Sequence, residues 1–258
     1  MKKTGHLFSA LFSFFLCAIC IVPFAYVLIT SFRDTQGNVT LTYYYQVFLG
    51  ESQYLFRFWK SIGLSLCIAV GQVAVSALAG YSFAKYSFPG KHILFFLFMI
   101  LMILPLQVTL MPNYIILEKA HILNTYASLA LPAVILPLGT FILTQSFRAI
   151  PNSVLEAARL DGCKLPGLLL RVVIPISRNA LVCVFLLSFL DAWNMVEQPI
   201  TYLKDFANYP IAVALASVPP GDPTVLLTAC VLVALPPLFL FTFFHQELTE
   251  GIALGGEK

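Results

Sequence analysis

Charged side chains are scarce in this sequence. Lys, Arg, Asp and Glu make up 10% of the 258 residues, whereas hydrophobic residues make up 59%. Soluble domains carry about 25% charged residues, and a water-soluble fold of this length could not bury so much apolar surface. A bilayer removes the conflict, because lipid then contacts the outer faces of apolar helices. The scarcity of charge therefore excludes an ordinary soluble domain and predicts an integral membrane protein.

The sequence also lacks the patterns of several other functions. No basic cluster of the kind that neutralises phosphates is present, which argues against nucleic-acid binding. Cys17 and Cys20 have CxxC spacing, but they lie in an apolar run without a second pair or a nearby histidine. We interpret them as small apolar helix residues. The four histidines lie at the ends of apolar segments without metal-ligand spacing, so the sequence predicts neither a metal site nor a disulfide framework.

Apolar runs long enough to cross a bilayer recur along the chain. A hydrocarbon core about 30 Å thick requires roughly 20 apolar residues in a helix. The first run begins near the N-terminus and is too long for the apolar part of a signal peptide, so we expect a retained membrane helix. The sequence predicts an all-α integral membrane fold, a single domain over residues 1–258 with six transmembrane helices at residues 7–32, 61–84, 93–117, 127–147, 179–199 and 225–245. Pro105 and Pro132 are expected to interrupt the third and the fourth of these helices.

The distribution of Lys and Arg predicts the orientation of the chain. With a cytoplasmic N-terminus, ten of the fifteen Lys and Arg residues fall in inside segments and five in outside segments. Cytoplasmic loops carry the excess of positive charge in membrane proteins. Both termini are therefore predicted to be cytoplasmic.

The long polar segment at residues 148–178 lies between the fourth and fifth predicted spans, on the cytoplasmic side. Ser153 and Glu156 have the spacing of a capping box, which predicts that a helix starts at Ser153. Gly162 is a plausible helix stop, and Pro166 suits the first turn of a second short helix. The segment is thus predicted to form a short helix-turn-helix outside the membrane.

The first of these short helices has the composition of a docking surface. Small residues would let another protein approach closely, and charged residues would orient it; the residues concerned are Ala157, Ala158 and Gly162, with Glu156, Arg159 and Asp161. A solvated loop with an ordinary helix explains the same composition equally well. From the residues alone, both interpretations stay open.

The same segment resembles the EAA motif of ABC-importer permeases. The stretch Glu156-Ala157-Ala158-x3-Gly162-x9-Val172-x-Ile174-Pro175 keeps the spacing of that motif, EAA-x3-G-x9-I-x-L-P, with conservative changes at two hydrophobic positions. In that family the element is a coupling helix that docks into a cytoplasmic ATPase subunit. The resemblance implies that this helix carries the closing motion of the ATPase into the membrane helices. Cys163 and Leu169 depart from the usual Ala and Phe, which affects the fit to a particular ATPase rather than the role.

Other stretches are similar to carbohydrate-type permeases, above all to the G type of maltose permease. They are residues 79–91, 104–112, 123–126, 192–194 and 209–210, together with the sugar-type coupling sequence Arg159-Leu160-Asp161-Gly162. The resemblance implies half of a translocation pathway for a sugar or oligosaccharide in the bacterial plasma membrane. It also implies three kinds of partner: a second homologous permease, two ATPase copies and an extracellular solute-binding protein. The chain has no GxxxxGK[ST] loop, so ATP and Mg²⁺ would bind to the ATPase subunits and no cofactor is expected in this chain.

Polar residues near the outer end of the fifth predicted span are candidates for the transport path. Asp191, Asn194 and Glu197 recur at i, i+3 and i+6, roughly one face of a helix, and Trp193 offers a ring that could stack on a sugar. Ionisable residues in membrane helices usually face a cavity or a partner, so contacts with a second subunit are the alternative. Gln107, which lies between two prolines of the third span, is a further candidate.

The sequence leaves three alternative functions open. The same scaffold could move a different solute, such as a glycerol phosphodiester or a peptide. A membrane-embedded enzyme is less favoured, because the sequence contains no GxSxG, no HExxH and no paired aspartates in two membrane helices. A sensor that does not transport is the third. The preferred prediction is a transporter subunit that is not itself an enzyme.

Overall fold

The described part of the protein is helical, with one isolated bridge between Arg33 and Val39 outside the helices. A computed structural model describes residues 2–33, 37–49, 54–216 and 223–256. Its elements in chain order are α1 (Lys2–Ser31), α2 (Thr42–Leu49), α3 (Tyr54–Lys85), α4 (Lys91–Ile103), α5 (Leu106–Lys119), α6 (Tyr126–Val134), α7 (Pro137–Ala149), α8 (Asn152–Leu160), α9 (Leu165–Leu168), the π-helix η1 (Leu169–Val173), α10 (Ile174–Ile176), α11 (Arg178–Trp193), α12 (Glu197–Tyr202), the 3₁₀-helix η2 (Phe206–Asn208), α13 (Ile211–Ala216) and α14 (Pro223–Gly256). The all-helical prediction is confirmed.

Several of these helices can cross a bilayer by length and composition. Three segments of the described chain do so directly: Tyr54–Lys85, Tyr126–Ala149 and Pro223–Glu247. Two bent pairs raise the number to five, Lys91–Ile103 with Leu106–Lys119 and Leu165–Ile176 with Arg178–Trp193. Within α1 the stretch Phe15–Ser31 is apolar but shorter. The described chain therefore has three to five candidate membrane-spanning segments, and six spans and their orientation stay predictions.

The third predicted span is broken at Pro105. Helices α4 and α5 meet there at a bend of 110°. Leu104, the residue before the proline, has extended backbone angles (φ −67°, ψ 129°), because the proline ring disfavours the helical conformation of its predecessor. This break turns the start of α5, and with it Gln107, away from the line of α4.

The fourth predicted span also has a break, although not at the expected proline. Pro132 lies inside α6, and the break comes at Leu136, directly before Pro137, which begins α7. The same steric rule explains the position, since Leu136 is extended (ψ 134°). The amide Nε2 of Gln72 on α3 donates a hydrogen bond of 3.2 Å to the Leu136 carbonyl. A side chain from a neighbouring helix thus supplies a hydrogen-bond donor to a carbonyl at the helix break, as membrane bundles require.

Helices α3 and α7 pack closely at positions without side chains. A Cβ built on Gly80 would lie 3.1 Å from Cβ of Leu143 and from the backbone nitrogen of Thr144. One built on Gly139 would lie 2.6 Å from Oγ of Ser76. Small residues at such crossings let helix backbones approach in membranes, where packing replaces the hydrophobic effect as the driving force.

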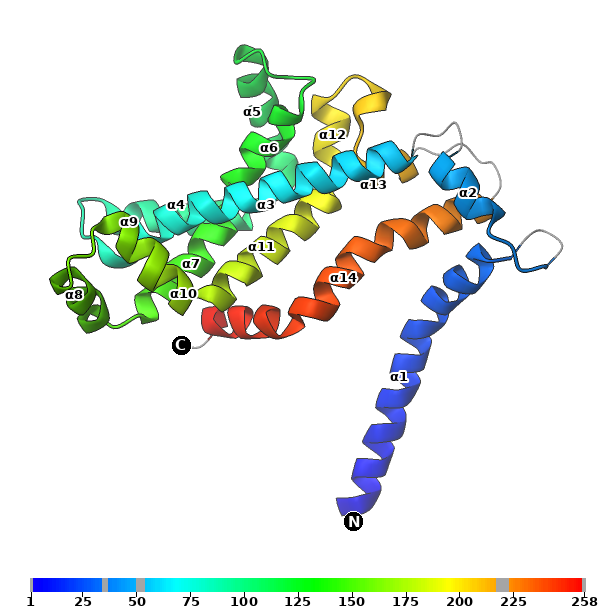
Figure 1. Ribbon diagram of the computed structural model, residues 1–258, viewed down its shortest axis with the longest axis horizontal. Helices are drawn as coiled ribbons and strands as arrows, with labels where there is room; N and C mark the ends of the chain where they lie inside the picture. The colour runs from blue at the N-terminus through cyan, green and yellow to red at the C-terminus, as the bar shows by residue number, and fades with distance from the viewer. Residues whose placement is uncertain (1, 34–36, 50–53, 217–222, 257–258) are drawn as a thin grey trace.

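The arrangement places short elements at both ends of the central bundle (Figure 1). Helices α8 and α9 lie at the C-terminal end of α3, together with the last turns of α14, and α2 and α13 lie at its other end. Helices α5, α6 and α12 project together from the bundle, whereas α1 extends away from it. Two regions outside the core therefore remain as candidate sites, α8 at one end and the α5–α12 region nearer the other.

Candidate functional site

Helix α8 starts one residue earlier than predicted, and without a capping box. Pro151 occupies the N-cap with polyproline-like angles (φ −59°, ψ 138°), and no side chain caps the helix. The prediction that Ser153 begins the helix is wrong, because the extended conformation of Pro151 already sets the boundary. The backbone N–H of Val154 bonds to the Pro151 carbonyl instead, at 3.2 Å.

The end of α8 confirms the predicted stop at Gly162. The helix ends at Leu160, and Gly162 has a left-handed φ of 84°. The N–H of Gly162 bonds to the Arg159 carbonyl and that of Cys163 to the Ala158 carbonyl, both at 3.0 Å. This pair of bonds is a Schellman motif, which requires the left-handed conformation that glycine adopts at least cost.

One face of α8 is fastened to the bundle. Leu155 is 3% exposed and belongs to a core cluster that includes Tyr81 of α3 and Phe147 of α7. Ala158 packs against the same cluster. The two alanines therefore differ: Ala157 is exposed, whereas Ala158 partly faces the bundle. The predicted contact surface is narrower than the sequence suggested, since Ala158 serves the attachment of α8.

The other face of α8 is exposed and carries apolar as well as charged side chains. Glu156, Arg159 and Asp161 are exposed, as predicted for a charged docking surface. Leu160 is 89% exposed and Val154 is 38% exposed, and sequence reasoning had not singled out either. The available signal was a leucine between two charged residues, in a helix outside the predicted spans. The exposed face of α8 therefore combines apolar area with charged side chains.

The predicted path residues surround one cavity near the end of α11. A cavity of about 450 Å³ is lined by Leu106, Leu136, Leu190, Asp191, Asn194, Met195, Val196, Glu197 and Gln198. Gln107 of α5 joins this group through its amide, which donates to both carboxylate oxygens of Glu197, at 2.9 and 3.1 Å. Four of the five candidates, Gln107, Asp191, Asn194 and Glu197, thus lie together. No described residue forms a hydrogen bond or ion pair with the Asp191 carboxylate.

These residues converge because the helix breaks, not because it continues. Helix α11 ends at Trp193 and α12 begins at Glu197, so the predicted single span over residues 179–199 is interrupted. Asp191 lies two residues before the end of α11. Asn194 is the C-cap, and its amide Nδ2 donates to the Leu190 carbonyl at 2.9 Å.

Trp193 does not belong to the cavity, which corrects its assignment to the path. Its side chain is 1% exposed and packs on Phe58 and Phe189, with ring centroids 5.6 and 5.8 Å away. Its indole N–H donates to the Val233 carbonyl of α14 at 3.2 Å. Two positions along an α-helix correspond to a rotation of about 200° around its axis. Trp193 and Asp191 therefore face opposite sides of α11.

Asn124 holds α12 in position beside α5. Asn124 has a left-handed φ of 61°. Its backbone N–H bonds to the Tyr202 carbonyl at 2.9 Å, and its side-chain oxygen accepts from the N–H of Lys204 at 2.9 Å. Its amide also donates to Asp205 at 3.2 Å. One backbone and two side-chain hydrogen bonds of Asn124 therefore fix the C-terminal end of α12 and the residues that follow it.

A smaller polar chamber of about 90 Å³ adjoins the cavity and shares Asp191 with it. Its other polar lining residues are Gln72, Thr109, Asn113, Ser188, Gln198 and Tyr202. The hydroxyl of Ser188 is buried and has no hydrogen-bond partner among the described residues. Sequence reasoning missed these side chains, although Gln72 inside an apolar run and Ser188 one turn before Asp191 were visible signals.

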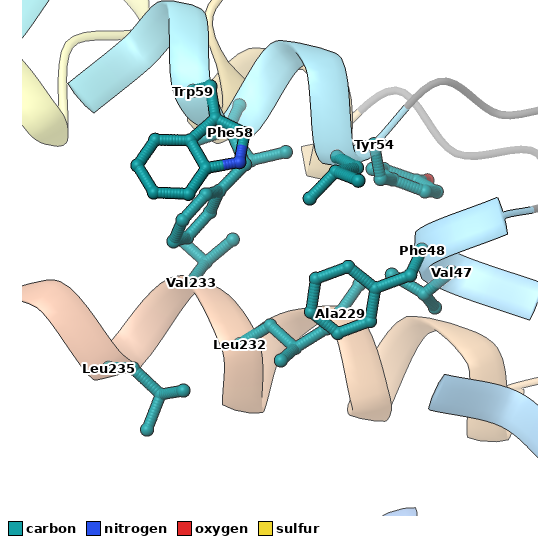
Figure 2. A pocket seen from close by; sticks show the side chains of 11 residues that line it. Val47, Phe48, Tyr54, Phe58, Trp59, Ala229, Leu232, Val233 and Leu235 are labelled. Atoms are coloured by element: carbon teal, nitrogen blue, oxygen red, sulfur yellow. The ribbon is translucent and has the colours of Figure 1, made fainter. Parts of the chain in front are cut away.

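A third cavity has a different chemistry. About 260 Å³ in volume, it lies between α2, α3, α13 and α14 and is lined by aliphatic and aromatic side chains (Figure 2). In this view Phe48, Phe58 and Trp59 lie around it, with Leu232 and Val233 from α14. None of the predicted path residues lines it. Polar groups that could pair the hydroxyls of a solute gather instead around Asp191.

These features together define a class of protein. A membrane-spanning helical chain with broken helices around a polar cavity is built for solute passage, and the exposed α8 offers a contact for another protein. The chain has no phosphate-binding loop. This combination of features is typical of the permease subunit of a membrane transporter.

The family follows from comparison with known proteins. The family described as "Binding-protein-dependent transport system inner membrane component" matches residues 72–252, more than half of the chain. The chain belongs to this family of ABC-transporter permeases, whose members lie in the inner membrane and work with ATPase and solute-binding partners.

Two relatives and one solved structure illustrate the similarity. The arabinooligosaccharides transport system permease protein AraQ of Halalkalibacterium halodurans is 27% identical over 100% of this chain and 99% of its own length. The sn-glycerol-3-phosphate transport system permease protein UgpE of Pectobacterium atrosepticum is 28% identical over 75% of this chain and 70% of its own length. The crystal structure of a bacterial ABC transporter involved in the import of the acidic polysaccharide alginate contains a chain of the same fold, with TM-score 0.78, 19% identity and coverage of 95% and 96%.

Proposed function

We propose that this chain forms half of the translocation pathway of an importer for a neutral sugar or oligosaccharide. A second homologous permease would supply the other half, and two ATPase copies would bind ATP and Mg²⁺ in the cytoplasm. An extracellular solute-binding protein would deliver the cargo. Six spans with both termini in the cytoplasm suit this arrangement, since they place α8 beside the ATPases. The proposal rests above all on α8, which has one face packed in the bundle through Leu155 and an opposite face that is exposed.

The proposed mechanism uses α8 as the coupling helix. Its exposed face, with Val154, Ala157 and Leu160, would sit in a groove of one ATPase. Its inner face is fixed in the bundle through Leu155, so that displacement of α8 moves the packed helices with it. ATP binding would close the ATPase pair and shift the cavity from inward-facing to outward-facing. Such a switch is a two-state equilibrium biased by a ligand bound on another chain.

The charges of the cavity favour a neutral or cationic cargo over an anionic one. The cavity and its adjoining chamber are lined by the carboxylates Asp191 and Glu197, and no Lys or Arg is among the lining residues. Carboxylates and amides pair well with sugar hydroxyls, whereas an anionic solute would meet like charge in a low-dielectric site. The relationship to AraQ supports an oligosaccharide. The relationship to UgpE keeps sn-glycerol-3-phosphate as the second candidate.

Co-purification tests the central part of this proposal. The chain would be affinity-tagged at its native chromosomal locus and extracted from membranes in mild detergent. We expect an ATPase, a second permease and a solute-binding protein to co-purify, with ATP hydrolysis by the complex. Isothermal titration of the solute-binding partner should then give binding of neutral oligosaccharides such as arabinotriose and none of sn-glycerol-3-phosphate. A chain that purifies without any ATPase would refute the transporter assignment, and binding of the phosphate ester alone would refute the cargo.

A further inference from the structure

Lys85, the last residue of α3, is bonded to both sides of the turn that begins α8. Its ammonium Nζ donates to the Ile150 carbonyl and to the side-chain oxygen of Asn152, the latter at 3.1 Å. These two acceptors flank Pro151, the N-cap of α8. Lys85 therefore connects a central membrane helix directly to the start of the exposed helix.

The start of α8 has little else to hold it. No side chain caps the helix, and proline has no N–H to donate. The Ile150 carbonyl lies at the C-cap of α7, where the helix dipole concentrates negative partial charge and a cation is stabilising. Hydrogen bonds from a charged donor are also stronger than those between neutral groups. The Lys85 ammonium is thus matched to its position between α7 and α8.

Helix α3 holds α8 at a second point on the same face. Tyr81 lies four residues before Lys85, one turn along the helix, and is part of the core cluster that receives Leu155 of α8. One contact is a hydrogen-bonded charge and the other is apolar packing. Together they fix both the position and the direction of α8 relative to α3.

The same helix reaches the polar chamber. Gln72 and Ile68 of α3 line the chamber that contains Asp191. Thirteen residues separate Gln72 from Lys85, a distance of roughly 20 Å along a helix. A rigid helix between the two sites can transmit a displacement from one to the other.

We propose that Lys85 is a positioning residue of transport, which ties the start of α8 to α3 so that a push on α8 moves the wall of the polar chamber. The inference rests on the proposed function, because it needs an ATPase that acts on α8. Lys85 itself touches neither cargo nor ATP in this scheme. Replacement of Lys85 leaves ATP hydrolysis by the ATPase intact but weakens the structural response of the polar chamber to nucleotide.

The test compares Lys85→Met with Lys91→Met in the complex purified from tagged strains and placed in lipid nanodiscs. Lys91 lies on the adjoining turn and donates to the Tyr86 carbonyl at 2.8 Å, so its replacement removes an equal charge without touching α8. Hydrogen exchange of residues 188–198 is measured with and without ATP and vanadate. This readout reports the response of the chamber and needs no knowledge of the cargo.

We expect Lys85→Met to reduce the nucleotide-dependent change in exchange at least about tenfold, because the variant loses both charge-assisted hydrogen bonds of Lys85, with ATP hydrolysis retained. Lys91→Met should respond like the unaltered chain, and Lys85→Arg should recover part of the change. An undiminished response in Lys85→Met overturns the inference. If that variant does not accumulate, Asn152→Ala, which removes one of the two bonds, replaces it, and its full response has the same meaning.

The unaltered chain separates this inference from the proposed function. A photoreactive benzoylphenylalanine at exposed Ala157 should crosslink to the ATPase. Absence of that crosslink, with no nucleotide response in the unaltered complex, contradicts the proposed function. Crosslinking and a normal nucleotide response in the unaltered complex, together with an equal response in Lys85→Met, contradict only the role of Lys85.

Discussion

The amide of Gln107 donates to both carboxylate oxygens of Glu197, at 2.9 and 3.1 Å, across ninety residues of sequence. Gln107 lies in the first turn of α5, just after the bend at Pro105, and Glu197 is the first residue of α12. The contact forms where two segments are interrupted, one by the bend between α4 and α5 and the other by the gap between α11 and α12. It closes one side of the cavity that also contains Asp191, and so gives the proposed path a defined polar wall.

Replacement of Glu197 by alanine should impair transport of a neutral sugar. The change removes the carboxylate from the cavity and leaves the Gln107 amide without its acceptor. We expect uptake of radiolabelled cargo by intact cells to fall about tenfold, because hydrogen bonds to charged groups contribute about 1.5–3 kcal/mol. Asp191→Ala should act in the same direction.

Glu118→Ala provides the matched control for these variants. Glu118 is an exposed carboxylate near the end of α5, and it does not line the cavity or its chamber. It should transport like the unaltered chain when the amounts in the membrane are equal. Wild-type uptake by both Asp191→Ala and Glu197→Ala would rule out their place in the path.

Replacement of Gly162 by alanine should disturb α8 through the backbone alone. Gly162 has a φ of +84°, and a Cβ at this position would meet nothing within 4 Å. The left-handed conformation costs an alanine about 1–2 kcal/mol, so the Schellman turn should loosen while the bundle remains folded. The expected result is reduced uptake with an unchanged melting temperature of the purified complex.

Gly90→Ala is the control for this backbone effect. Gly90 has a φ of +79° and equally open surroundings, but it lies in the turn between α3 and α4 rather than at the end of α8. The two variants suffer similar strain, so only a role of α8 in coupling separates them. Equal uptake by the two would show that the geometry of the α8 stop is unimportant.

Replacement of Gly139 by alanine should destabilise the bundle. Its new methyl group would lie 2.6 Å from Oγ of Ser76 and 2.9 Å from Cγ1 of Val184, both in the packed interior. Overpacking of this kind costs about 1–3 kcal/mol, which thermal unfolding of the detergent-purified complex would register as a lower melting temperature. Gly63→Ala on α3 has nothing within 4 Å and should leave the melting temperature unchanged or raise it. A Gly139→Ala complex as stable as Gly63→Ala would contradict the close crossing of α3 and α7.

Composition and proline placement predicted much of the fold. Hydropathy located the three helices and the two bent pairs that can cross a bilayer, because the bilayer restricts spanning structures to helices with satisfied backbones. Pro105 marked the bend between α4 and α5, and Gly162 marked the end of α8. The break before Pro137 was missed in favour of Pro132, although the residue before a proline is the one that leaves the helix.

The sequence predicted three residues of the candidate site but misplaced Trp193. Asp191, Asn194 and Glu197 were grouped as one face of a continuous helix, and they do meet at the cavity. The chain reaches this arrangement by ending α11 at Trp193 and restarting at Glu197, which no periodicity in the sequence indicates. Trp193 was assigned to the cavity by its chemistry, but its direction is fixed by packing against Phe58 and Phe189. Contacts between residues far apart in the chain cannot be inferred from the local spacing of residue types in the sequence.

The same substitution at two leucines of α8 should separate attachment from docking. Leu155 is 3% exposed in the core, so Leu155→Ala should destabilise the bundle by about 2–5 kcal/mol. Leu160 is 89% exposed, so Leu160→Ala should leave the melting temperature of the purified chain unchanged and reduce the ATPase recovered with it, because it removes apolar contact area from the docking face. Quantitative co-purification and thermal unfolding would measure the two effects. A Leu160→Ala chain that retains its full complement of ATPase would place the docking surface elsewhere. The unchanged melting temperature of this variant separates an effect on docking from an effect on stability.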